Sequence, residues 1–159
     1  MAGTVLVPDL SAQKWNRYGP GTRSQASAIY DSSTDQMIMN FIEREKLPAN
    51  LFNGYTLGGH LTWRLFPAYR DYIDSRALPF GSELFFRGYD LATEPPTSEA
   101  WRREADARNI NTIIVPLARY QGMTVFPPLH AFCRSSLWRP VYLDEVSAVF
   151  VRASPENNA

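Results

Sequence analysis

Apolar residues recur at helical spacing around residue 40 and form one stripe, with charged residues on the opposite side. The stripe consists of Met37, Ile38, Phe41 and Ile42. It predicts an amphipathic helix that ends before Pro48. Ser33 and Gln36 stand three residues apart just ahead of the stripe, which is the spacing of a capping box at the start of that helix.

Short apolar runs alternate with further helical patterns along the rest of the chain. Strands are expected at 51–52, 69–73, 112–117, 141–143 and 146–151. Further helices are expected at 60–66, from Ser82, after a cap at Thr97 or Ser98, and after Pro128. This order predicts an α/β fold, namely a three-layer α/β/α domain with a mainly parallel sheet and a C-terminal antiparallel hairpin at its edge.

The domain organisation follows from the distribution of these patterns. Residues 1–30 lack a regular period and contain Gly-Pro-Gly, so they are expected to form a linker or an extended arm. Residues 31–153 are expected to form a single α/β domain, and 154–159 a disordered tail. A length of 159 residues with 45% hydrophobic residues is enough for one domain with its own core.

Composition and charge narrow the classes of function. Lys plus Arg and Asp plus Glu number 16 each, and no basic run stands out, so we expect no nucleic-acid partner. The mixed-sign run from Arg102 to Glu104 indicates a solvated helix face. One cysteine and two histidines that are far apart predict neither a disulfide nor a metal site, and we expect no cofactor. No apolar run is long enough to span a bilayer, so the chain as given is expected to be soluble.

Polar residues and glycines gather at the joints between the predicted strands and helices. Because loops at the carboxyl ends of parallel strands converge, we expect these residues to form a binding site. The candidate residues are Asn53, Tyr55, Gly58, Gly59, His60, Asp74, Arg76 and Glu83. Gly58 and Gly59 would offer backbone N–H groups to an anion just before the predicted helix, or would serve close helix–strand packing. Asp74 would face either a cavity or Arg76.

No catalytic residue can be assigned from the sequence. Gly54, Gly58 and Gly59 do not have the spacing of a dinucleotide fingerprint, and no phosphate-binding loop ends in Gly-Lys-Ser/Thr. No G-x-S-x-G elbow occurs that would supply a hydrolase serine. The identity of any catalytic group therefore stays unknown at this point.

The stretch LFNGYTLGGHLTWRLFP (51–67), followed by YRDYIDSR (69–76) and GSELF (81–85), resembles a family signature. That signature lies in the C-terminal soluble region of bacterial multi-pass membrane proteins similar to the GT-C class of lipid-dependent glycosyltransferases, some of which also carry tetratricopeptide repeats. IVPL (114–117) and VYLDEVSAVFVR (141–152) resemble the later elements of the same pattern. His60 and Ser75 depart from it, because the pattern has Tyr and Gly at these two positions.

The resemblance implies an extracytoplasmic domain at the cytoplasmic membrane whose partner is the membrane part of the same polypeptide. It favours a non-catalytic accessory domain that binds a glycan, a lipid-linked sugar or a partner protein. One alternative is a small transferase that uses the loop from Asn53 to Gly59 for a nucleotide or a phosphate. Another is a purely structural domain, in which Asp74 and Arg76 would form a closed ion pair.

Overall fold

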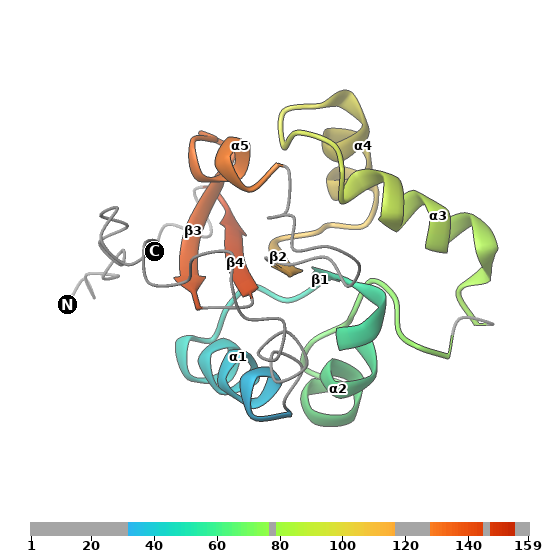
Figure 1. Cartoon of the computed structure of the whole chain (residues 1–159), viewed down its shortest axis with the longest axis vertical. Coiled ribbons are helices and arrows are strands. Elements are labelled where there is room, and N and C mark those ends of the chain that lie inside the picture. Colours follow the sequence, from blue (N-terminus) through green and yellow to red (C-terminus); the bar gives the residue numbers. More distant parts are fainter. Residues whose placement is uncertain (1–31, 77–78, 117–127, 145–146, 155–159) are drawn as a thin grey trace, which may run out of the picture.

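A computed structural model describes residues 32–76, 79–116, 128–144 and 147–154 (Figure 1). The predicted arm at 1–30 and most of the predicted tail lie outside these residues. The elements in chain order are α1 (Ser32–Glu45), β1 (Leu51–Asn53), α2 (Tyr55–Leu65), α3 (Gly81–Leu91), α4 (Glu99–Ala107), β2 (Thr112–Pro116), α5 (Leu129–Cys133), β3 (Trp138–Leu143) and β4 (Ser147–Arg152).

The four strands form one mixed sheet in the order β1-β2-β4-β3. β1 pairs with β2 in parallel, whereas β4 runs antiparallel to both β2 and β3. The predicted mixed α/β class is confirmed, and so is the antiparallel C-terminal hairpin. The predicted parallel majority is not confirmed, since one of the three pairings between described strands is parallel.

The segment 69–73 was expected to be a strand, and this prediction is wrong. The segment runs along β1 but makes only one backbone hydrogen bond typical of a ladder, from Leu51 N to Arg70 O at 2.8 Å. At the next pairing position the Asn53 side chain, not its backbone, accepts from Tyr72 N at 2.8 Å. A side chain thus replaces the backbone partner, so the segment borders the sheet without extending it.

Residues on the two faces of the sheet belong to two separate apolar clusters. Ile113 and Val115 of β2 pack in the cluster that includes residues of α4 and α5. Ile114, the residue between them, packs with residues of α1 and α2. This alternation is the two-residue period of a strand that is buried on both sides. Figure 1 shows α1 and α2 on one side of the sheet and α4 and α5 on the other.

Trp101 is the centre of the larger cluster. Its ring packs edge-on against Phe52 of β1, Phe132 of α5 and Trp138 of β3, with centroids 4.6, 5.5 and 6.2 Å away. Its indole N–H donates to the carbonyl of Leu91 at 2.9 Å, which ties α4 to the end of α3. The cap predicted at Ser98 is confirmed, because its hydroxyl accepts from Trp101 N at 3.2 Å.

Two helix boundaries differ from the sequence prediction. α2 begins at Tyr55, five positions before the predicted start, so Gly58 and Gly59 lie inside the helix. α3 begins at Gly81, whose φ of +74° suits glycine, and Ser82 does not cap it. In α1, Met39 is buried and Met37 is 51% exposed, so the apolar stripe is rotated from the predicted one. The side chains of the predicted capping box start at Ser33, outside the described side chains.

Candidate functional site

The predicted site is built where β1 runs into α2 and meets the turn at residues 72–76, which we call the Asp74 turn. Asn53, the last residue of β1, is 1% exposed. Its amide donates to Ile73 O at 2.8 Å and to Gly54 O at 3.0 Å, and its oxygen accepts from Tyr72 N. Every polar atom of this amide therefore has a partner inside the protein, and Asn53 fixes the start of the Asp74 turn to the end of the sheet.

Gly58 is where α2 touches the Asp74 turn backbone to backbone. A Cβ at this position would lie 2.0 Å from the carbonyl oxygen of Ile73 and 2.6 Å from the Cα of Asp74. At Gly59 a Cβ would meet only the Ser75 hydroxyl, at 3.3 Å. Anion binding and close packing were both open for Gly58 and Gly59; both residues lie inside the helix, and Gly58 is buried against the turn. Close packing is the role that the geometry supports.

Asp74 and Arg76 face each other. The Asp74 carboxylate is fully buried and accepts from the Arg76 backbone N–H at 2.9 Å and from its Nε at 2.8 Å, with Nη2 as a third donor. These hydrogen bonds from Arg76 hold the pKa of Asp74 below its usual range. The Arg76 side chain is 63% exposed, so it covers the carboxylate from the solvent side. The arrangement is a closed ion pair within one turn.

Tyr55 completes this set of contacts, whereas His60 and Glu83 lie outside it. The Tyr55 hydroxyl donates to Ser75 O at 2.8 Å, and its ring packs edge-on against Phe85 of α3. His60 is exposed on α2. Glu83 is exposed on α3 and pairs with Arg87 one turn further along the same helix. The structure thus brings together Asn53, Tyr55, Gly58, Gly59, Asp74 and Arg76, and we call these six residues the β1–α2 junction.

A second polar cluster surrounds Glu104, which the sequence placed on a solvated helix face. That prediction is wrong, because Glu104 is 6% exposed. Its carboxylate accepts from the Tyr72 hydroxyl at 2.8 Å, from Arg87 at 3.3 Å and from Arg108. Burial alone would raise the pKa of Glu104, but the hydrogen bonds from Tyr72 and Arg108 and the adjacent charges hold it below its usual value. The sequence did contain one signal for this burial: Glu104 is three residues after Trp101 and four before Arg108, so the three residues share one face of the helix.

Asp71 is the one described side chain with a buried oxygen that lacks a partner. Thr62 of α2 donates to one carboxylate oxygen at 3.1 Å, while Oδ2 has no hydrogen bond among the described residues. Burial raises the pKa of Asp71, and the charge of Asp74 adds to this rise. A carboxylate in this position is destabilised in the folded state relative to the unfolded chain.

We expect Asp71→Asn to raise the free energy of unfolding at pH 7 relative to the unaltered protein. A carboxyl with a raised pKa in the folded state costs stability once ionised, and this cost disappears as the pH falls below its pKa in the unfolded chain. The difference between the two proteins should therefore shrink toward pH 3. Urea unfolding at several pH values measures it, and a variant that is less stable at pH 7 would contradict the expectation.

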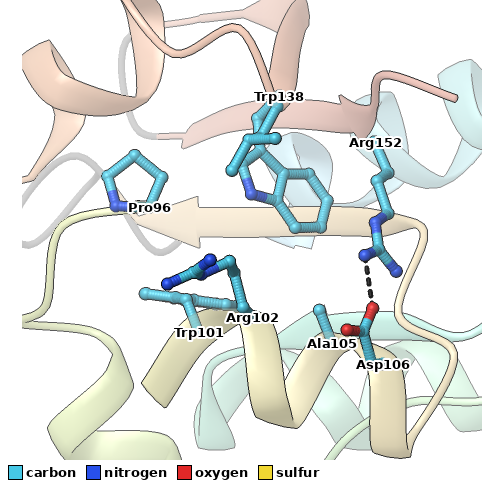
Figure 2. A pocket seen from close by; sticks show the side chains of 8 residues that line it. Pro96, Trp101, Arg102, Ala105, Asp106, Trp138 and Arg152 are labelled. Carbon is cyan, nitrogen blue, oxygen red and sulfur yellow. Dashed lines mark hydrogen bonds and ion pairs between the residues drawn. The ribbon is translucent and has the colours of Figure 1, made fainter. Parts of the chain in front are cut away.

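The described part of the chain contains a small pocket, at the junction of α4 with β3 and β4, that shares no residue with the predicted site (Figure 2). No group of three or more His, Cys, Asp and Glu side chains within the described ranges is arranged to hold a metal ion. No helix among those ranges is long and apolar enough to cross a membrane.

Comparisons with protein-family models, with curated proteins and with solved structures gave no match for this chain.

Proposed function

We propose that this chain is a non-catalytic accessory domain, displayed on the extracytoplasmic side of a polytopic membrane protein that resembles the GT-C glycosyltransferases. The single observation that carries the non-catalytic part is the ion pair of the β1–α2 junction. Both oxygens of Asp74 accept hydrogen bonds from Arg76, and the side chain is 1% exposed, so a substrate has no access to either oxygen in this arrangement.

The other polar groups of the junction support the same role. A general acid or base must reach the proton that it transfers, and a binding group must have an unused donor or acceptor. Asn53 uses its amide nitrogen and its oxygen within the protein, and the Tyr55 hydroxyl uses its one proton in the hydrogen bond to Ser75 O. Gly58 has its Cα packed against the backbone of residues 73 and 74. The junction thus holds β1, α2 and the following turn together.

This role also supplies a physical reason for the family-like motif. The residues that this sequence shares with the pattern include Asn53, Gly58, Asp74 and Arg76. Each of them makes a contact within the junction that another residue type would lose. The motif is then a marker of how the domain is built, and the resemblance supplies its setting: a partner that is the membrane part of the same polypeptide. Glycans and lipid-linked sugars remain candidate ligands of the assembled protein in this proposal.

The extracytoplasmic placement is tested by fusing alkaline phosphatase after the last residue of the protein encoded by the native reading frame, in a bacterial host. Alkaline phosphatase becomes active only where its disulfides form, outside the cytoplasm. We expect active phosphatase from this fusion. A matched fusion to a fluorescent protein that matures only in the cytoplasm should stay dark. Inactive phosphatase together with a fluorescent matched fusion would contradict the placement.

A further inference from the structure

Apolar side chains stay uncovered where α2 ends. Trp63 is 90% exposed, and Phe66, nearly one turn further along, is 63% exposed. Pro67 and Ala68 are exposed as well, so three consecutive apolar residues face the solvent. We call Trp63, Phe66, Pro67 and Ala68 the Trp63 patch. A run of exposed apolar residues is expected on a protein surface only where it serves a function.

The fold itself does not use the Trp63 side chain. α2 packs on the core through Leu61 and Leu65, which are 1% and 3% exposed. Trp63 lies midway between them in the sequence, so at about 100° per residue its side chain points away from the core. It has no ring contact and no hydrogen bond within the described ranges. Whatever covers Trp63 therefore comes from outside this part of the domain.

Two cations beside the patch have no acidic partner. The side chains of Lys46 and Arg70 are exposed, and neither makes an ion pair or a hydrogen bond within the described ranges. The hydrogen bond from the Tyr69 hydroxyl to Ile42 O, at 3.2 Å, joins the segment after α2 to the last turn of α1. It brings the two cations to the same end of the domain as the patch.

The acids at this end do not cancel the two charges. Glu43 pairs with Arg64 at 2.8 Å, and Glu45 pairs with Arg44 at 2.7 Å, so both of these acids are already balanced. Asp71 turns its carboxylate inward, because its Oδ2 is buried. An excess of positive charge therefore remains on the solvent side after these pairs have been counted.

The size and composition of this surface distinguish between possible occupants. The patch exposes roughly 400 Å², judged from the usual size of two aromatic side chains and their neighbours. Each partner in a stable protein–protein interface buries about 800 Å², twice that area. Lysine is also depleted at such interfaces. Tryptophan flanked by cations is instead typical of surfaces that meet the headgroups of a bilayer, where a few inserted side chains suffice.

We propose that the Trp63 patch inserts into the surface of an anionic bilayer, with Lys46 and Arg70 beside the lipid phosphates. The rings of Trp63 and Phe66 lie at the boundary between headgroups and acyl chains, while the two cations stay in the headgroup layer and attract anionic lipids. The inference deepens the accessory role proposed above. It rests on that role only in that a domain fused to a membrane protein is held beside a bilayer.

The test uses the 159-residue chain with the substitution Trp15→Phe. Trp101 and Trp138 are 1% and 3% exposed, so Trp63 is then the one tryptophan that lipid can reach. The vesicles contain equal parts of phosphatidylglycerol and phosphatidylcholine, and bromine on their acyl chains quenches tryptophan fluorescence. We expect quenching that is half complete at roughly 1 mM lipid. It should be weak with phosphatidylcholine alone, or in about 0.5 M salt, which screens the charges.

Two matched pairs of variants separate the apolar from the charged contribution, with binding measured by vesicle flotation. Trp63→Ala should weaken binding roughly tenfold. Phe86→Ala, which removes a 62% exposed ring from α3, should leave binding unchanged. Arg70→Gln should weaken binding to anionic vesicles roughly fivefold. Arg134→Gln removes an exposed cation at the end of α5, on the opposite side of the sheet, and should have no effect.

The proposal fails if Trp63 is not quenched, if phosphatidylcholine vesicles bind as well as anionic ones, or if either variant of the patch behaves like its matched control. Dimerisation of the chain that Trp63→Ala abolishes would also overturn it, because the occupant would then be a second copy. None of these results bears on the phosphatase fusion, so failure here is distinct from failure of the proposed function.

Discussion

Gly58→Ala should lower the free energy of unfolding by about 3 kcal/mol or prevent folding altogether. The new Cβ would lie 2.0 Å from Ile73 O and 2.6 Å from Asp74 Cα, and both are backbone atoms that cannot rotate away. Either α2 or the Asp74 turn has to shift, and the hydrogen bonds of Asn53 to the turn shift with it. Urea unfolding followed by circular dichroism measures the loss.

Gly59→Ala is the matched control for this substitution. It changes the next residue of the same helix and brings the same gain in helix propensity, about 1 kcal/mol. Its Cβ would meet only the hydroxyl of the exposed Ser75, which can turn away. We expect this variant to be as stable as the unaltered protein or more so. If both alanine variants had the same stability, close packing at Gly58 would not be the role of this glycine.

Asn53→Ala should lower the free energy of unfolding by about 3 kcal/mol, which is the second large effect that we expect. The substitution leaves Tyr72 N and Ile73 O buried without the partners that they now have in the Asn53 amide. Each such group costs about 1–3 kcal/mol when buried and unpaired. Asn40→Ala serves as control, because Asn40 is exposed and its loss should change stability by no more than about 0.5 kcal/mol.

Asn53→Asp gives the pH dependence that separates hydrogen bonding from packing. The carboxylate would keep the acceptor for Tyr72 N but would face the carbonyls of Gly54 and Ile73. Burial beside these oxygens should raise its pKa in the folded state. The loss in the free energy of unfolding is then largest at neutral pH and shrinks as the pH falls. Asp74 has the opposite pH dependence, because its ionised form stabilises the folded protein at neutral pH. A stability loss that does not depend on pH would contradict this reading of the Asn53 contacts.

The sequence predicted the elements whose signals are local. The β-branched run at 112–115 is a strand, and Ser98 is a helix cap, because strand propensity and capping depend on neighbouring residues. The start of α2 was missed because Gly58 and Gly59 lower helix propensity by about 1 kcal/mol each relative to alanine. Packing of Gly58 on residues 73 and 74 outweighs that cost, and such contacts are not visible in the local pattern.

Six of the eight candidate site residues lie together in the structure, but their chemical role could not be predicted from the sequence. Convergence of loops at the end of a strand brings Asn53 close to Asp74, and that is a matter of topology. Whether Asp74 faces Arg76 or a ligand depends on side-chain rotamers and burial. Glu104 was misplaced for a similar reason, since mixed charges normally face water and its burial depends on Tyr72, 32 positions earlier.

An NMR titration of the Asp74 carboxyl carbon tests most directly whether Asp74 and Arg76 form a closed ion pair. Because its pKa is depressed in the folded state, Asp74 stabilises the protein above its unfolded-state pKa, and this contribution is lost as the pH falls through the folded-state value. We predict a midpoint clearly below that of an exposed aspartate, and a rise toward the ordinary value in Arg76→Ala. An ordinary midpoint that Arg76→Ala leaves unchanged would contradict the account.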